Sequence, residues 1–171
     1  MHKPTPTREE LDAIPVSDDE VKQYLDGLAR IEKALHKARI PANLEWAFVI
    51  MNASAQTLVI QGMPREFYMM LAESSFGGAL LRVSESRLPR DLPDPTNVMA
   101  NMAPRVARLF GALTAARIEL ADPDTCPMLL AVAAAECARN AFPLELFLVC
   151  CDAAYTDAET RITAMGKKSQ A

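Results

Sequence analysis

Apolar residues recur at helical spacing along most of the chain, and short polar or proline-containing segments separate them. The clearest stretch runs from Ser17 to Arg39, where steps of three and four residues define one narrow seam. Ser17 and Glu20 form a capping box at its start, and Pro41 prevents easy continuation beyond its end. The apolar positions of this seam are Val21, Tyr24, Leu28, Ile31, Leu35 and Ala38.

The segment from Asn43 to Gln61 fits two structures. As a helix, most of its apolar side chains share one face, and as two short strands it would pair across residues 52–55. Its β-branched and aromatic residues favour strands, but the turn between them lacks glycine and any Asn-Gly or Asp-Gly pair. Gly62, closely followed by Pro64, is typical of one helix ending and another beginning. We therefore favour the helix and keep the β-hairpin as the alternative.

Four further helices are expected after Gly62. They run from Pro64 to about Val83, from about Asn97 to Leu120, from Pro127 to Asn140 and from Pro143 to about Met165. Pro104 lies inside the second of these, so we expect a kink or a split there. Residues 86–97 hold three prolines and predict a stiff, extended connector. The predicted fold class is therefore all-α, a bundle-like array of five to seven helices.

The same pattern predicts how the chain is divided. Residues 1–15 are expected to form a flexible N-terminal arm, because prolines and polar residues dominate them. Residues 16–165 are expected to form a single helical domain, which is an ordinary size for one hydrophobic core. Residues 166–171 are expected to be a frayed tail.

Two parts of the chain match when the sequence is shifted by 79 residues. The matching pairs are Pro64 and Pro143, Glu66 and Glu145, Glu73 and Asp152, and Phe76 and Tyr155. An apolar segment about one helix long precedes each copy. The match raises the hypothesis of two pseudo-repeated helical hairpins joined by the connector. The simpler interpretation, which we prefer, is two ordinary hairpins whose prolines and glutamates have local causes.

Composition places the chain among globular proteins, because 50% of its 171 residues are hydrophobic and 23% are charged. A net charge of −4 without a basic cluster argues against nucleic acid as a partner. Charged residues interrupt even the most apolar stretch, 128–154, so we expect no membrane span. The four cysteines form no C-x-x-C pair and are expected to be reduced core residues of a cytoplasmic protein. The alanine-, arginine- and proline-rich composition resembles that of proteins from GC-rich bacteria or their phages.

The sequence offers little for catalysis. Its two histidines, His2 and His36, lie in the arm and at the end of the first helix, without a nucleophile motif nearby. No phosphate loop, dinucleotide fingerprint or zinc motif occurs, so we expect no catalytic residue, no cofactor and no metal site. Glu73 and Asp152 would face each other if a twofold axis relates the hairpins, and paired carboxylates can perform acid–base chemistry. Each is more simply a charge on a solvated helix face.

These features predict a non-enzymatic protein–protein interaction module, such as an adaptor, a chaperone-like binder or an inhibitor. Its partner would be another protein, or a second copy of the chain in a homodimer. A helical bundle that binds a small apolar ligand is the alternative, and an enzyme that uses Glu73 and Asp152 is the third hypothesis. The candidate partner-binding residues lie on the first helix and on the connector: Tyr24, Leu28, Leu35, Arg87, Leu88, Arg90 and Leu92.

Overall fold

The computed structural model describes residues 16–83, 98 and 100–168, and this part of the chain is helical without any strand. The predicted all-α fold class is therefore confirmed. Six helices are described, within the expected range. They are α2 (Asp18–Lys37), α3 (Leu44–Ile60), α4 (Arg65–Arg82), α6 (Met102–Ala115), α7 (Thr125–Arg139) and α8 (Leu144–Lys168).

Helix α2 begins where its capping residues place it. The Glu20 amide donates a hydrogen bond to the Ser17 hydroxyl at 3.2 Å, and the Ser17 amide donates to the Glu20 carboxylate at 2.8 Å. These bonds complete the expected capping box, and the backbone bond from Ser17 lowers the pKa of Glu20 below its usual value. The helix ends at Lys37, and the chain then turns through Arg39 in the left-handed region, with φ 54°.

The ambiguous segment 43–61 contains a helix, α3, and the β-hairpin alternative is excluded. The Trp46 amide donates to the Asn43 side chain at 2.9 Å, which caps the helix start. Almost the whole helix is buried, including Val49 and Ala53, which lie off the single apolar face that we expected. Packing from several sides outweighs the β-propensity of these residues, because local preferences are weak compared with burial.

Pro104 splits the expected fourth helix instead of merely kinking it. Residues 98 and 100 are helical, Asn101 forms a turn, and α6 begins at Met102. Pro104 is then the third residue of α6, a position where the amide has no partner within the helix. The split thus removes the conflict between proline and a helix interior.

Two helix ends differ from the sequence expectation. Helix α6 stops at Ala115 instead of Leu120, because Arg117 turns the chain through the left-handed region with φ 57°. Helix α8 continues to Lys168, into the segment expected to fray. The N-terminal arm and residues 169–171 lie outside the described part of the chain.

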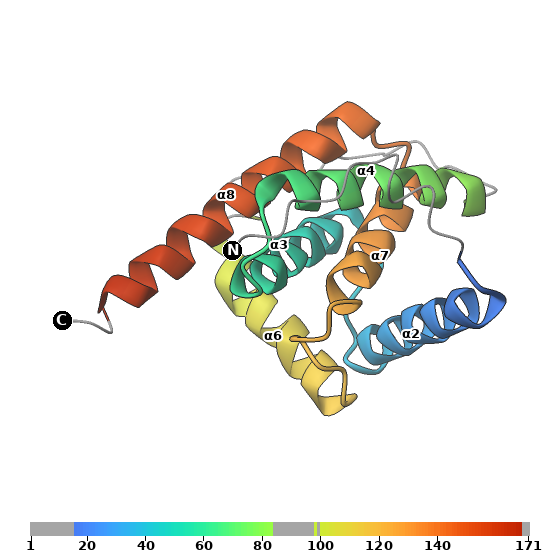
Figure 1. Ribbon diagram of the computed structural model, residues 1–171, viewed down its shortest axis with the longest axis horizontal. Helices are drawn as coiled ribbons and strands as arrows, with labels where there is room; N and C mark the ends of the chain where they lie inside the picture. Colours follow the sequence, from blue (N-terminus) through green and yellow to red (C-terminus); the bar gives the residue numbers. More distant parts are fainter. Residues whose placement is uncertain (1–15, 84–97, 99, 169–171) are drawn as a thin grey trace.

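The six described helices form three layers of two, as Figure 1 shows. Helices α3 and α7 cross in the middle layer, with α4 and α8 on one side of them and α2 and α6 on the other. One hydrophobic cluster runs through all three layers. Each outer layer therefore presents one surface to solvent, and these two surfaces lie on opposite sides of the molecule.

An approximate twofold axis through the three layers relates a first unit (α2, α3, α4) to a second unit (α6, α7, α8). The packing is reciprocal, because α2 and α4 contact α7 while α6 and α8 contact α3. Helices α3 and α7 end 79 residues apart, at Ile60 and Arg139. Helices α4 and α8 begin at the same separation of 79 residues, at Arg65 and Leu144. The structure therefore favours the pseudo-repeat over two unrelated hairpins.

The turns inside the two hairpins are also equivalent. Gly62 (φ 71°) and Ala141 (φ 52°) are both left-handed and stand 79 residues apart. The amide that follows each of them donates to the carbonyl five residues earlier, at 3.2 Å in the first unit and 2.9 Å in the second. This is a common way to close a helix end, and it sets the direction of the next helix.

The same twofold axis relates two pairs of buried aromatic rings to each other. The Tyr68 and Tyr155 ring centroids are 5.6 Å apart, and those of Phe76 and Phe147 are 5.0 Å apart. Phe147 is the equivalent of Tyr68 and Tyr155 is the equivalent of Phe76, so one pair maps onto the other. Each pair joins α4 to α8 and thereby holds the two units together.

The relation extends to α2 and α6, which the sequence analysis did not match. Residues 28–40 and 106–118, offset by 78, share seven identities: Ala29/Ala107, Arg30/Arg108, Ala34/Ala112, Leu35/Leu113, Ala38/Ala116, Arg39/Arg117 and Ile40/Ile118. An extra residue between α6 and α8 changes the offset to 79, so a single fixed shift misses this match. Sequence comparison that allows one insertion would have found it.

The repeated arginines of α2 and α6 act reciprocally. Arg30 donates to the Arg117 carbonyl at 3.3 Å, and Arg108 donates to the Arg39 carbonyl at 3.1 Å. Arg108 also donates to the Ala38 carbonyl at 2.9 Å. Each guanidinium thus binds the C-terminal end of the other unit's first helix, where the helix dipole favours a positive charge.

Candidate functional site

A groove opens between α2, α7 and the turn that joins α2 to α3. It consists of two overlapping hollows of about 840 and 680 Å³. One hollow extends to Trp46 and the other to Arg82 at the end of α4. We call this depression the α2–α7 groove. Its two hollows share Glu32, Ala42, Glu136 and Arg139.

The floor of the α2–α7 groove is apolar. Its side chains belong to the hydrophobic core, and the amphipathic spacing of α2 turns Leu28 and Leu35 toward α7. Each of the floor residues is at most 8% exposed, so the floor is the outer edge of the core and shows only a little of its apolar surface to solvent. The floor residues are Leu28, Leu35, Ile40, Trp46, Ile50, Ala131 and Val132.

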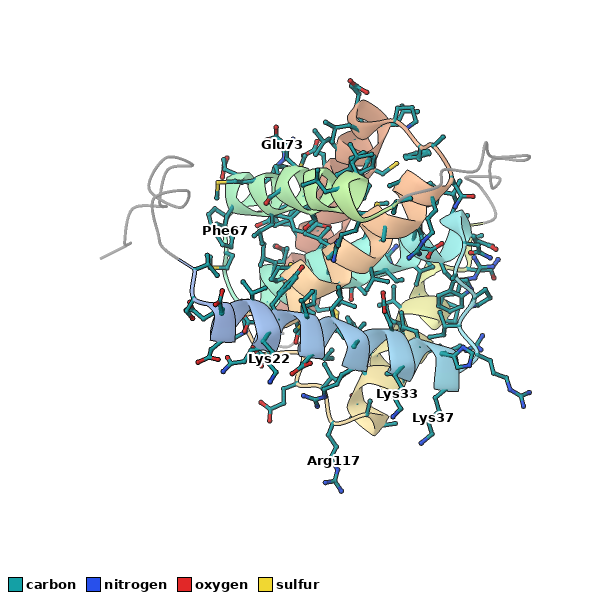
Figure 2. The ribbon with its side chains drawn as sticks, turned by 90° about the vertical axis from the view of Figure 1, so that its right-hand side faces the viewer. Lys22, Lys33, Lys37, Phe67, Glu73 and Arg117 are labelled. Atoms are coloured by element: carbon teal, nitrogen blue, oxygen red, sulfur yellow. The ribbon has the colours of Figure 1, made fainter. Side chains whose placement is uncertain are left out.

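Charged side chains form the rim. Four cations, besides His36, stand against two anions, so the rim is positive in a chain whose net charge is −4. Figure 2 shows Lys33 and Lys37 of α2 pointing away from the core, with Arg117 on the same side of the molecule. The rim cations are Lys37, Arg39, Arg82 and Arg139, and the anions are Glu32 and Glu136.

Glu136 places a carboxylate within this apolar surface. It is only 7% exposed, and it forms an ion pair with Arg139, which lies on the next turn of α7 and is about half exposed. The partner is needed because a buried carboxylate without one costs several kcal/mol. The pair leaves the outer side of the Arg139 guanidinium available to solvent or to a ligand.

The equivalent surface, between α6 and α3, keeps two of the four rim cations, with Arg117 for Arg39 and Arg161 for Arg82, and has neutral residues at the other charged positions. Phe110 stands at the position of Glu32, and its ring packs against the core. The other equivalents are Thr114 for His36, Ala115 for Lys37, Thr57 for Glu136 and Ile60 for Arg139. Because the same fold forms around neutral residues at four of these positions, the backbone does not require the charges of Glu32, Lys37, Glu136 and Arg139.

The candidate residues from the sequence fall in three places. Leu28 and Leu35 are buried and form part of the groove floor, so the apolar seam of α2 packs largely within its own chain. Tyr24 is half-buried, and burial raises the pKa of its hydroxyl. The connector candidates lie outside the described residues: Arg87, Leu88, Arg90 and Leu92.

Sequence analysis did not find the groove itself. Trp46, Glu136 and Arg139 are brought to α2 only by the crossing of α3 and α7. One sequence signal could have pointed to the groove. When α2 and α6 are aligned, Glu32 stands opposite Phe110, a charged residue against an aromatic one.

The cysteines are unsuited to nucleophilic chemistry at neutral pH. All four are free thiols. Burial raises the pKa of Cys126 to about 12 and raises the pKa of Cys137 and of Cys151 still further. Since the thiolate is the reactive form, these three thiols are inert while the protein is folded.

The carboxylates considered for an enzyme lie in the α4–α8 layer. Asp152 forms an ion pair with Arg65, and this hydrogen bond lowers the pKa of Asp152 below its usual value. A carboxylate held in this way stays ionised and is a poor proton donor near neutral pH. Glu73 lies on the exposed side of α4, far from the lysines of α2 in Figure 2.

Other classes of site find little support in the described part of the chain. Among its residues, no three acidic, histidine or cysteine side chains gather to hold a metal ion. None of its helices combines the length and apolarity needed to cross a membrane. Comparisons with protein-family models, with curated proteins and with solved structures give no match to this chain. Function must therefore be inferred from the groove itself.

Proposed function

We propose that this protein is a non-enzymatic interaction module whose α2–α7 groove binds an acidic, amphipathic segment of a partner protein. The observation that carries the proposal is the contrast between the α2–α7 groove and its counterpart between α6 and α3. The groove has Glu32, Lys37 and Arg139 where the counterpart has Phe110, Ala115 and Ile60. Charges that the fold does not need are best explained by contact with something else.

The shape of the groove supports a polypeptide as the occupant. Sites for small molecules usually enclose 70–90% of the ligand surface. The α2–α7 groove is instead an open depression that extends from the turn after α2 to the end of α4. An amphipathic helix fits such a surface, because its apolar face covers the floor while its polar face stays in water.

The charge of the rim supports an acidic occupant. With Glu136 paired to Arg139, the remaining rim ions are Lys37, Arg39 and Arg82 against Glu32. Electrostatic complementarity of this kind steers association and rejects partners of the wrong charge.

A cytoplasmic location belongs to the same proposal. Its support is the presence of four free thiols, three of them buried, without a disulfide among the described residues. Proteins of oxidising compartments more often use their cysteines in disulfides.

The test titrates the full chain with two fluorescent helical peptides and follows fluorescence anisotropy. Both peptides carry leucine at positions i, i+3, i+4 and i+7, and they differ in having glutamate or lysine elsewhere. The glutamate peptide is expected to bind, with an affinity that falls as salt is added. Glu32→Phe places a phenyl ring where the two hollows meet. Because the ring fills the groove, it should weaken this binding by about tenfold or more, or about 1.4 kcal/mol, even though loss of the Glu32 carboxylate alone would favour an acidic peptide.

Matched variants separate the groove from general charge effects. Lys37→Ala removes a rim cation and should weaken the glutamate peptide severalfold, whereas Lys22→Ala removes a cation of α2 outside the groove and should change little. Thermal unfolding should show that Glu32→Phe remains folded, since phenylalanine already occupies the equivalent position in α6. The proposal is overturned if the glutamate peptide does not bind, or if Glu32→Phe leaves its Kd unchanged.

A further inference from the structure

Methionine and aliphatic side chains also line the outer surface of α4 and α8, in the layer opposite α2 and α6. Met69, Met70 and Leu148 border a shallow hollow of about 410 Å³. Val149 of α8, next to Leu148, is 62% exposed. Exposed apolar area of this kind is unfavourable in water, and a bound partner would remove that cost by covering it. We call these four residues and the carboxylates around them the α4–α8 face.

The apolar part of the α4–α8 face is present in both units. Leu148 is the equivalent of Met69, and Val149 is the equivalent of Met70. The twofold axis passes between α4 and α8, which contact each other, so it sets the two copies of the pattern side by side. Both helices therefore contribute apolar side chains to the patch.

The charge of this face is negative. Glu66 and Glu73 border the hollow. The negative charges of Glu66 and Glu159 both help to raise the pKa of Arg65. Among the described residues that line the hollow, Arg65 is the one cation, and it forms an ion pair with Asp152. Glu145, one helical turn before Leu148 and Val149, adds a carboxylate on α8.

We infer that the α4–α8 face is a second docking surface, and that it binds a cationic amphipathic helix of a partner protein. Carboxylates around an apolar centre complement a helix that has lysine or arginine on its polar face and leucine or phenylalanine on the other. Methionine side chains suit such a surface, because their flexible thioethers adapt to different partner shapes. A second copy docked through the same face is disfavoured, because it would set carboxylates against carboxylates.

This inference does not depend on the groove. The α4–α8 face is acidic and belongs to one outer layer, whereas the α2–α7 groove is basic at its rim and is built on α2, in the other outer layer. If both surfaces are used, the chain would bridge two partners of opposite charge.

The test uses the lysine peptide described above with the full chain. Anisotropy should show binding of this peptide, weakened about fivefold or more by Met70→Ala with Val149→Ala, because the apolar centre is removed. Glu66→Gln with Glu145→Gln should weaken it and reduce its dependence on salt, because two carboxylates are lost. Glu32→Phe should leave it unchanged, which distinguishes failure at this face from failure of the groove.

A matched control and a direct observation complete the design. Leu25→Ala with Asp26→Asn removes one exposed apolar residue and one carboxylate from α2, and it should leave the lysine peptide's Kd unchanged. In carbon-labelled protein, the methyl signals of Met69 and Met70 should shift on titration, whereas that of the buried Met51 should not. The inference is overturned if the lysine peptide does not bind, if the α2 control weakens it as much as the α4–α8 variants do, or if the Met69 and Met70 signals do not move.

Discussion

At Glu32 the first unit places an exposed carboxylate in the α2–α7 groove, whereas the second unit places the half-buried ring of Phe110 at the equivalent position. The inner sides of the same two helices are nearly alike, with Leu35 and Leu113 both buried. Residues that face the core are constrained by packing, whereas residues on the solvent side of the same helices are free to differ. The difference teaches that one scaffold, used twice, carries different surface residues at its two equivalent grooves, as expected if the α2–α7 groove is the proposed binding surface.

The outer layer of α4 and α8 shows the opposite relation. There both units keep an apolar pair flanked by carboxylates, Met69 and Met70 in one and Leu148 and Val149 in the other. A surface that lies on the axis is shared by the two units, so both must supply it. The groove lies off the axis, between α2 of one unit and α7 of the other, so its counterpart between α6 and α3 can carry different residues.

The largest effect is expected where the two units are most alike. Tyr68→Ala and Phe147→Ala each remove a fully buried ring that packs across α4 and α8, and each should lower the free energy of unfolding by roughly 3–5 kcal/mol. Urea unfolding monitored by circular dichroism measures both. If one variant is nearly neutral while the other is severe, the two units do not contribute equally to the core.

A smaller, opposed pair of effects is expected at the hairpin turns. Gly62→Ala should destabilise by about 1 kcal/mol, because an L side chain at φ 71° is strained although no atom lies within 4 Å of its Cβ. Ala141→Gly should stabilise by up to about 1 kcal/mol, because it relieves the same strain at φ 52°. Thermal unfolding should shift in opposite directions for the two variants, and shifts of the same sign would show that the turns are not equivalent.

The smallest difference is expected between the two reciprocal arginines. Arg108 donates to two carbonyls and lies 5.4 Å from the centre of the Trp46 ring, whereas Arg30 donates to one carbonyl at 3.3 Å. Arg108→Ala should therefore lower stability by about 1 kcal/mol, and Arg30→Ala by less. Chemical denaturation of both variants under one set of conditions tests the order. The reverse order would mean that the contacts with Trp46 and with the end of α2 contribute little.

Local sequence signals were enough to predict the helices, but not to predict which helix surfaces are exposed. The Ser17 and Glu20 capping box, the prolines before α4 and α8, and the break near Pro104 all predicted helix ends within a few residues. The candidate contact residues on α2 were chosen from its apolar seam, and two of them, Leu28 and Leu35, pack inside the chain. An apolar stripe indicates that a helix is covered, but it does not indicate by what.

The sequence by itself determined where helices start and stop, because capping, proline geometry and left-handed turns act over a few residues. It also contained the repeat, although an extra residue concealed the match between α2 and α6. Only the tertiary structure decided that 43–61 is helical, because burial from several sides overrode local β-propensity. Only the crossing of α3 and α7 brought Trp46, Glu136 and Arg139 to α2, because a groove is made by contacts between residues far apart in the chain.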